Sequence, residues 1–357
     1  MARLTCALMF VFANIAACSG APPQSAKNKP TAAPMVWTAP TMDRAALRHE
    51  AALNAPPPPP EDPPPPTHPG RPEAAERVLF LATHLRTTDL RDACPVTLAE
   101  VARIRCLISL RYADEVDSKA LALTLYAETG SLAGLLPEET NEDNKGKKIR
   151  LKPARPIGKN MQHLEWIVEA MRAYAGFFYE LSKVQKKPIV MTDRPLDFRF
   201  FYTEEGGTPS AFAVGRNIGY NLNGTLNVHE EAVRDTLFHE IFHLNDVWQD
   251  NFSARMLAPI EARILANCKS DLKCLSRYAP TDTTMNGKPY AFTDGGNGKE
   301  YAAELALRYF REQRLMMDGK PLPVPAFKCG APENAEAMAL LVDTFFGGVD
   351  LVPECGS

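Results

Sequence analysis

Residues 228–248 read VHEEAVRDTLFHEIFHLNDVW, and this stretch decides how the rest of the chain is interpreted. Apolar side chains recur every three or four residues, which predicts a helix with one buried side. That side comprises Val233, Leu237, Ile241, Leu244 and Trp248. Within the helix His239 and His243 are four residues apart, so their imidazoles lie on one face and can reach the same metal ion.

Glu240 lies beside this pair and completes the spacing His-Glu-x-x-His. At that position a carboxylate can contact a metal-bound water without being a ligand itself. Two imidazoles and a carboxylate are costly in an otherwise apolar helix unless they are paired or bind metal. The motif therefore predicts a metal site, and a chance occurrence in a structural helix is the alternative.

A second helix with carboxylates is predicted downstream, at residues 299–311, KEYAAELALRYFR. Glu300 and Glu304 are four residues apart and share one face of it. Zinc in a hydrolytic site takes three protein ligands and keeps one open position. One glutamate can complete that set, and the other can accept the free imidazole N–H of a ligand histidine. The alternative is a solvated face near Lys299 and Arg308.

This combination of motifs resembles the gluzincin metallopeptidases, and it is similar to the catalytic domain of anthrax-toxin lethal factor and to the Pro-Pro endopeptidases. Asp246 follows the histidine motif by three residues, as in that family. Glu300-Tyr301-Ala302-Ala303-Glu304 is similar to the Glu-aromatic-aromatic-Ala-Glu opening of its second helix, with Ala302 at the second aromatic position. Tyr290-Ala291-Phe292-Thr293-Asp294 is close to its tyrosine motif. The resemblance covers residues 185–312, and about three residues within the glycine-rich stretch GGNGK are extra relative to the family.

The resemblance implies a zinc-dependent endopeptidase that hydrolyses peptide bonds with a zinc-activated water and Glu240 as general base. It implies Glu300 as the third zinc ligand, Glu304 and Asp246 as supporting residues around the ligands, and Tyr290 as the group that stabilises the oxyanion. It also implies an α+β, zincin-like domain with a small mixed sheet and an active-site helix. Two alternatives are an inactive zincin-fold lipoprotein that acts as a binding or scaffolding module, and a zinc hydrolase of a non-protein amide.

The rest of the globular part is interpreted from its periodicity. Residues 73–136 show helical spacing of apolar residues, and the charged stretch 138–156 predicts an exposed loop. Further predicted elements are a long amphipathic helix at 160–185 and β-strands at 188–192, 197–203 and 210–222. The strand at 210–222 is predicted to be the sheet edge, to which an extended peptide can pair.

The N-terminus reads MARLTCALMFVFANIAAC over residues 1–18, a charged start followed by a short apolar run. The run is too short to span a bilayer, which needs about 20 residues, and is typical of a secretory signal peptide. Ile15-Ala16-Ala17-Cys18 resembles the bacterial lipoprotein box, with Ser19 after it resembling the outer-membrane sorting choice. This predicts a signal peptide at 1–17 and a lipid on Cys18, and an ordinary signal peptide with an accidental cysteine is the alternative.

The remaining organisation follows from composition. Of the 31 prolines, 16 fall between Pro22 and Pro72, which predicts a stiff tether over residues 18–72. A mostly helical lobe is predicted at 73–157 and the catalytic domain at 158–357. The predicted location is therefore the bacterial cell envelope, as an outer-membrane lipoprotein held by its lipid alone.

The net charge and the cysteine content indicate which partners and which disulfides to expect. A net charge of −3 argues against nucleic acid as a partner. A peptide or protein substrate is what the resemblance to the metallopeptidases implies. Six cysteines remain after Cys6 and Cys18, and an even number in an oxidising compartment predicts disulfides. Fifteen pairings are possible. The simplest joins nearest neighbours: Cys94 with Cys106, Cys268 with Cys274, and Cys329 with Cys355.

Overall fold

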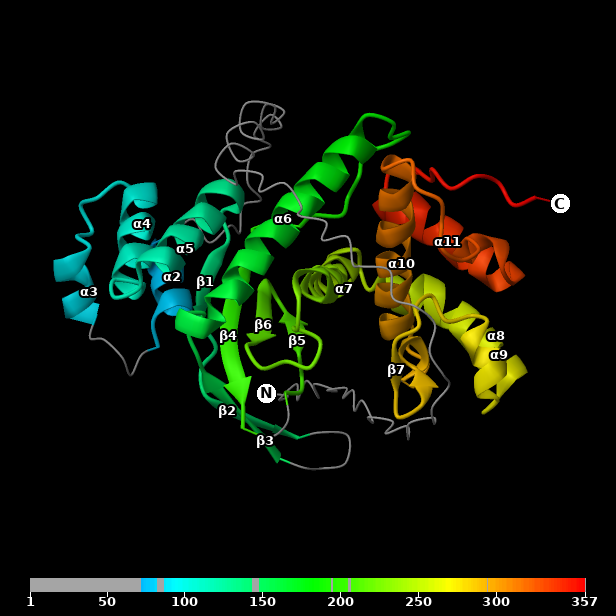
Figure 1. Cartoon of the computed structure of the whole chain (residues 1–357), viewed down its shortest axis with the longest axis horizontal. Coiled ribbons are helices and arrows are strands. Elements are labelled where there is room, and N and C mark those ends of the chain that lie inside the picture. Colours follow the sequence, from blue (N-terminus) through cyan, green and yellow to red (C-terminus); the bar gives the residue numbers. More distant parts are fainter. Residues whose placement is uncertain are drawn as a thin grey trace, which may run out of the picture. The chain divides into compact units, whose positions relative to one another are not determined.

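The computed structural model describes residues 72–81, 87–142, 148–193, 195–204, 207–293 and 295–356. These residues form helices around a mixed sheet, so the predicted α+β class is confirmed (Figure 1). The predicted signal peptide, Cys18 and all of the tether except Pro72 lie outside the described residues.

The longer helices are α2 (Pro72–Leu79), α3 (Thr87–Ala93), α4 (Glu100–Arg111), α5 (Val116–Thr129), α6 (Met161–Ser182), α7 (Glu230–Trp248), α8 (Ala258–Cys268), α9 (Leu272–Ser276), α10 (Lys299–Met317) and α11 (Pro332–Phe345). Short helical turns are η1 (Gly158–Asn160), η2 (Ser253–Leu257), η3 (Tyr290–Phe292) and η4 (Phe327–Cys329). The strands are β1 (Leu132–Leu135), β2 (Glu139–Glu142), β3 (Lys148–Pro153), β4 (Asp197–Thr203), β5 (Ala211–Val214), β6 (Asn217–Asn221), β7 (Thr284–Met285) and β8 (Lys288–Pro289).

The main sheet is built around β4. Its strand order is β2-β3-β4-β6-β5, and β1 also pairs with β4. β4 is parallel to β1 and β6 and antiparallel to β3, while β5 is antiparallel to β6. Phe198, Phe200 and Phe201 of β4 are fully buried, and successive side chains of a strand point to opposite faces. Both faces of β4 are therefore covered, which suits a central strand.

One predicted loop forms strands, and one predicted strand is absent from the described sheet. The segment predicted as an exposed loop at 138–156 forms the antiparallel pair β2 and β3, because Ile149 and Leu151 alternate with polar residues and are buried. The predicted strand at 188–192 is wrong, since its only pairing among the described residues is a bridge between Ile189 and Phe346. β1 to β3 join the same sheet as β4 to β6, so the sheet extends across the predicted boundary between residues 157 and 158.

Glycines account for two further differences. The predicted helical region ends at Gly130, which caps α5 in the left-handed conformation, and residues 132–135 then form β1. The predicted strand at 210–222 is a hairpin of β5 and β6, and Gly215 in its turn has a φ of +64°. β5 ends the strand order of the described sheet, so the predicted edge position is confirmed for this part of the segment.

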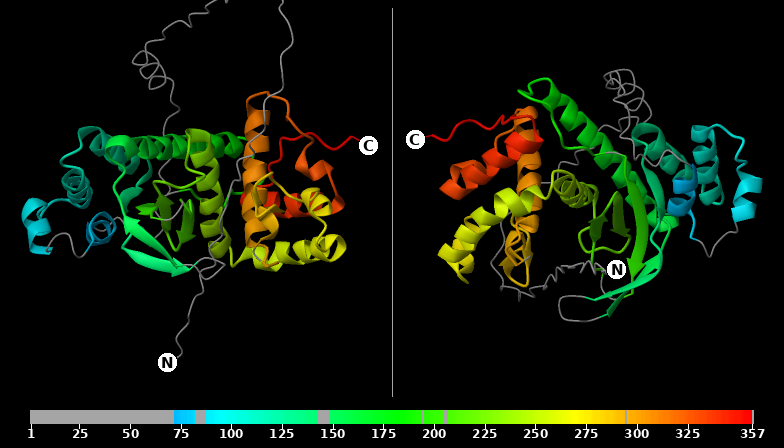
Figure 2. Two further views of the ribbon diagram at one scale, coloured as in Figure 1. Left: turned by 60° about the horizontal axis from the view of Figure 1, so that its bottom comes forward. Right: turned by 180° about the vertical axis from the view of Figure 1, so that it is seen from behind.

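Helices α6, α7 and α10 hold the core together on one side of the sheet (Figure 2). Phe238 of α7 stacks on Phe310 of α10 with ring centroids 4.3 Å apart, and Tyr174 of α6 meets both rings edge-on. Such aromatic pairs are worth about 0.5–1.5 kcal/mol beyond their area burial. Because Phe238 precedes His239 directly, this packing fixes the helix face that carries the histidines.

The predicted buried side of α7 is confirmed in its first four positions, which are at most 3% exposed. Trp248 is the exception, with 41% exposure. It lies at the C-terminal end of the helix, where the guanidinium of Arg216 lies 5.8 Å from its ring centroid. The end of the helix therefore extends beyond the core.

The cysteines pair as nearest neighbours. Disulfides join Cys94 to Cys106, Cys268 to Cys274 and Cys329 to Cys355, as the simplest pairing predicted. Among the described residues, no helix is long and apolar enough to span a membrane.

Candidate metal centre

Helix α7 presents the two histidines from a well-defined start. His229 caps the helix by accepting a hydrogen bond at Nδ1 from the backbone N–H of Ala232, at 3.1 Å. Glu230 and Glu231 in the first turn interact favourably with the positive end of the helix dipole. His239 and His243 then follow at the spacing that the sequence predicts, and their ring centroids are 4.7 Å apart.

Helix α10 presents the glutamates, and its start is fixed by close packing. Its N-cap is Gly298, with a φ of +80°, and a Cβ there would lie 2.7 Å from the carbonyl oxygen of Ser253. The buried side chain of Glu261 accepts a hydrogen bond from the Gly298 N–H at 2.8 Å. The glycine-rich insertion is thereby held against η2 and α8, two residues before Glu300.

Three side-chain atoms from the two helices converge. His239 Nε2 lies 3.0 Å from His243 Nε2 and 3.1 Å from Glu300 Oε2, and His243 Nε2 lies 3.6 Å from the same oxygen. Ligand atoms of a tetrahedral zinc ion with bonds of about 2.0–2.1 Å are about 3.3 Å apart. The three residues therefore fit a metal ion in geometry as well as in donor type.

Glu304 supports this group from the other side of the His239 ring. Its Oε1 lies 2.9 Å from His239 Nδ1, and the side chain is only 4% exposed. A carboxylate only accepts hydrogen bonds, so His239 donates from Nδ1. Its Nε2 is consequently the atom that faces His243 and Glu300, as a metal ligand must.

The electrostatics of the centre agree with this arrangement. Burial lowers the pKa of His239, but hydrogen bonds and charges from Glu300 and Glu304 outweigh it and raise that pKa well above its ordinary value. Burial raises the pKa of Glu300, but the facing histidines outweigh it and hold that pKa far below its usual range. Glu300 is thus ionised and attracts positive charge, whether from imidazolium or from a metal ion.

Glu240 and Tyr290 line the same cavity as His239, which has a volume of about 490 Å³. Burial raises the pKa of Glu240 above its ordinary value, against the two histidines, which lower it. The Tyr290 ring lies 5.8 Å from the His239 ring, and burial followed by the charge of Glu300 raises the pKa of its hydroxyl well above the ordinary value. Tyr290 therefore stays protonated and can donate a hydrogen bond.

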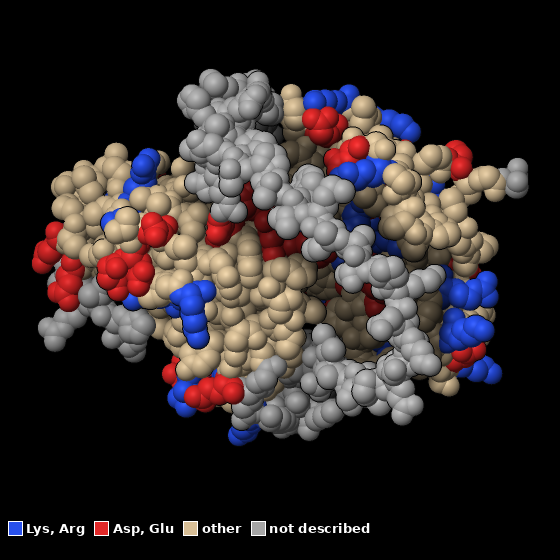
Figure 3. All heavy atoms as spheres, viewed as in Figure 1, with Lys and Arg blue, Asp and Glu red and all other residues tan. Residues whose placement is uncertain are grey.

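The charged residues that line the cavity are mostly acidic. Besides Glu240 and Glu304 it is lined by Asp235, Asp282 and Glu231, and by the cation Arg311. Arg311 donates two hydrogen bonds to Asp235, at 2.7 and 3.1 Å. Acidic side chains also gather in the hollow near the centre of the face in Figure 3.

The structure brings together most, but not all, of the residues singled out from the sequence. His239, His243, Glu300 and Glu304 meet, and Glu240 and Tyr290 line the adjoining cavity. Asp246, predicted as a supporting residue around the ligands, makes its side-chain hydrogen bonds to Ser253 instead. Its oxygens accept hydrogen bonds of 2.6 Å from the backbone N–H and the hydroxyl of Ser253, so it fixes the chain after α7.

Sequence reasoning missed two contributors to the site. Arg311 lies two turns after Glu304 on α10, which helical spacing alone indicates as the same face. Thr281 donates a hydrogen bond to Glu304 Oε2 from a segment without regular structure, and no motif signals it.

Comparison with known proteins returned no match among family models, curated proteins or solved structures.

Proposed function

We propose that the protein is a zinc-dependent endopeptidase of the gluzincin type, with His239, His243 and Glu300 as ligands. The convergence of their three ligand atoms within 3.0–3.6 Å carries the proposal. The nitrogen and oxygen donors suit zinc. Glu304 orients His239 by accepting its Nδ1–H, as residues that hydrogen-bond to ligand histidines do at zinc sites. The zincin-like fold class is part of the same proposal, supported by a mixed sheet with an antiparallel edge strand beside the metal helix.

Each remaining residue of the site has a role in this proposal. A zinc ion bound there would supply a Lewis acid that polarises a carbonyl group and acidifies a water molecule. Glu240, whose pKa is raised by burial, takes the proton from the attacking water and delivers it to the leaving amine. Tyr290 donates a hydrogen bond to the substrate's carbonyl oxygen as negative charge develops on it.

The substrate is an extended peptide bound along β5. This strand is one edge of the described sheet, and Thr208 to Ala211, which lead into it and begin it, line the cavity that contains His239. Backbone N–H and C=O groups at a sheet edge can pair with an added strand. A peptide held there would place its scissile bond beside the metal centre.

The central experiment is the substitution Glu240→Gln in the full chain, with zinc content and peptide-library cleavage measured on the same samples. Wild type should hold one zinc per chain and cleave, whereas Glu240→Gln should keep the zinc and lose cleavage about 100- to 10,000-fold. His243→Ala is the matched variant that should lose the metal itself. Equal cleavage by Glu240→Gln and wild type would show that the assigned base is wrong.

The same measurements separate the alternatives. A wild-type chain without zinc would remove the metal centre. Zinc without cleavage of any peptide would instead favour a binding module or a hydrolase of a non-protein amide.

The envelope location is a separate part of the proposal, supported by the lipoprotein-like sequence before Cys18. Cys18→Ser should abolish the incorporation of labelled fatty acid into the protein in expressing bacteria. Cys6→Ser is the matched control, because Cys6 would leave with the signal peptide and its loss should change nothing. Equal incorporation of the label into Cys18→Ser and wild type would refute lipidation at Cys18.

A further inference from the structure

Both oxygens of the Glu304 carboxylate accept hydrogen bonds. Its Oε1 receives the His239 Nδ1–H at 2.9 Å, and its Oε2 receives the hydroxyl of Thr281. Glu304 is 3% exposed and Thr281 is 9% exposed, so this contact is shielded from bulk water. The orientation of His239 therefore depends on a carboxylate that is itself oriented by Thr281.

The direction of the hydrogen bonds is fixed by their chemistry. Thr281 Oγ1 also lies 3.1 Å from Thr283 Oγ1 and 3.3 Å from the Thr283 backbone nitrogen. Its single proton goes to the carboxylate, the stronger acceptor, and the backbone N–H of Thr283 donates to Thr281 Oγ1. Thr283, Thr281, Glu304 and His239 thus form a continuous chain of hydrogen bonds that ends on a metal ligand.

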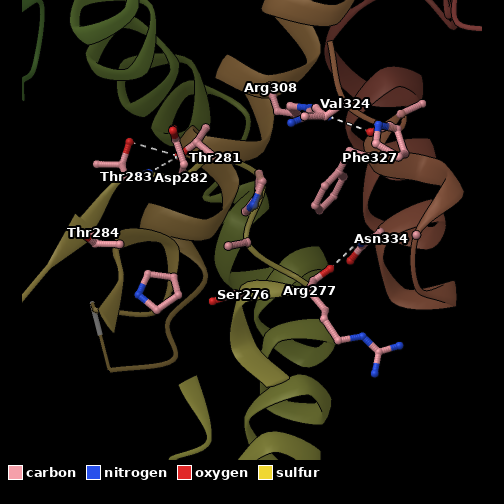
Figure 4. Close-up of a pocket in the computed structure, with 16 residues that line it drawn as sticks. Ser276, Arg277, Thr281, Asp282, Thr283, Thr284, Arg308, Val324, Phe327 and Asn334 are labelled. Atoms are coloured by element: carbon pink, nitrogen blue, oxygen red, sulfur yellow. Dashed lines mark hydrogen bonds between the residues drawn. The ribbon is translucent and has the colours of Figure 1, made fainter. Parts of the chain in front are cut away.

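Asp282 and Thr283, which follow Thr281 directly, line two cavities, and Thr281 itself lines one of them. The cavity of the metal centre lies on one side of residues 282 and 283, and a second cavity of about 470 Å³ lies on the other. In Figure 4 Thr281, Asp282 and Thr283 form one wall of this second cavity, opposite Phe327 and Asn334. Without the Thr281 hydroxyl, water from this cavity can take its place and turn the Glu304 carboxylate away from His239.

We propose that Thr281 is a positioning residue of the metal centre, which holds Glu304 in the orientation that keeps His239 Nε2 directed at the metal. The inference rests on the proposed metal site and extends it by one residue. Loss of a residue that orients a ligand typically weakens metal binding 10- to 100-fold. Since Thr281 acts through Glu304, we expect the lower end of that range.

The test compares Thr281→Val, which keeps the shape and loses the hydroxyl, with Thr281→Ser, which keeps the hydroxyl. Zinc affinity of the full chain is measured by competition with a chromophoric chelator. Thr281→Val should bind zinc about tenfold more weakly than wild type, and Thr281→Ser should bind within twofold of it. Thr284→Val is the control. Thr284 lines the same cavity but takes no part in the series of hydrogen bonds that runs from Thr283 to His239.

A second measurement does not depend on metal. The Nδ1–H of His239 is observed by proton NMR in histidine-labelled, metal-free protein, and its exchange with water is measured. Exchange should be faster in Thr281→Val and unchanged in Thr281→Ser and Thr284→Val, while thermal melting of the metal-free variants confirms that they fold.

The outcomes separate this inference from the proposed function. Wild-type zinc affinity and Nδ1–H exchange in Thr281→Val, or equal losses in Thr281→Val and Thr281→Ser, would overturn the role of Thr281. A wild-type chain that binds no zinc would overturn the proposed function, and the exchange measurement would then decide the role of Thr281 alone.

Discussion

At the scale of single residues, the two ring nitrogens of His239 have different roles. Nδ1 donates to Glu304, and Nε2 faces His243 and Glu300. The sequence predicts that the histidines share a face, because that follows from helical geometry. It does not predict Thr281, because that contact depends on how an irregular segment packs against α10.

His163 shows the opposite case, a histidine that the fold keeps neutral. It is buried in α6, its Nδ1 lies 3.0 Å from the Tyr220 hydroxyl, and burial lowers its pKa to about 4. The unfolded chain therefore binds a proton below about pH 6.5 that the folded chain does not. This contribution to stability is complete at neutral pH and is lost as the pH falls toward 4.

We therefore expect His163→Gln, which does not titrate, to reduce the pH dependence of unfolding. Between pH 7 and pH 5 the wild type should lose about 2 kcal/mol more stability than the variant, measured by urea unfolding with the disulfides intact. Asp197, whose pKa burial raises to about 6, has the opposite dependence, which is present in both proteins and cancels in the comparison. Parallel curves for the two proteins would show that His163 titrates normally in the folded state.

At the scale of elements, prediction succeeded where the pattern was strong and local. The strand at 197–203 has the predicted bounds, because its aromatic run suits a strand covered on both faces. The strands at 138–156 were missed because charged residues dominate the segment. Only Ile149 and Leu151 indicate that one face of β3 is buried. Pairing with β4, a long-range contact, makes this segment a strand.

The start of α10 gives a prediction at this scale. Gly298 and Gly295 both have positive φ, +80° and +82°, but only at Gly298 would a Cβ meet backbone atoms within 3 Å. Gly295→Ala should cost about 1–2 kcal/mol from backbone strain alone. Gly298→Ala should cost at least about 2 kcal/mol more, because rigid backbone of η2 and α8 must move.

Urea unfolding of the two alanine variants measures the difference in their free energies of unfolding. Their zinc affinities show whether the displaced start of α10 also alters the metal centre. Glu300 lies two residues after Gly298, so a displaced α10 start should weaken zinc binding in Gly298→Ala and not in Gly295→Ala. Equal losses of stability in both variants would mean that the close approach at Gly298 is not tight.

At the scale of the whole molecule, the candidate site joins parts that are distant in sequence. α7 and α10 each pack on the other through Phe238 and Phe310, while the ligand atoms lie between them. The apolar contacts bring the helices together, and the polar atoms of the site face one another as a consequence. A metal ion there would cross-link the two helices, and its binding free energy would add to the stability of the fold.

We therefore expect metal removal to lower the melting temperature of the full chain. Free zinc at about 100 times its dissociation constant stabilises a protein by about 2.7 kcal/mol. For a domain of this size that corresponds to a shift of at least about 5 °C. Calorimetry of the full chain with excess zinc and with excess chelator measures this shift.

Two variants show whether the shift arises at the proposed site. His243→Ala removes a ligand, so its melting temperature should no longer respond to zinc or chelator. Glu240→Gln removes no ligand, so it should keep the full shift although it cannot cleave peptides. A shift of wild-type size in His243→Ala would place the metal elsewhere in the molecule, because a site between α7 and α10 cannot stabilise the fold without that imidazole.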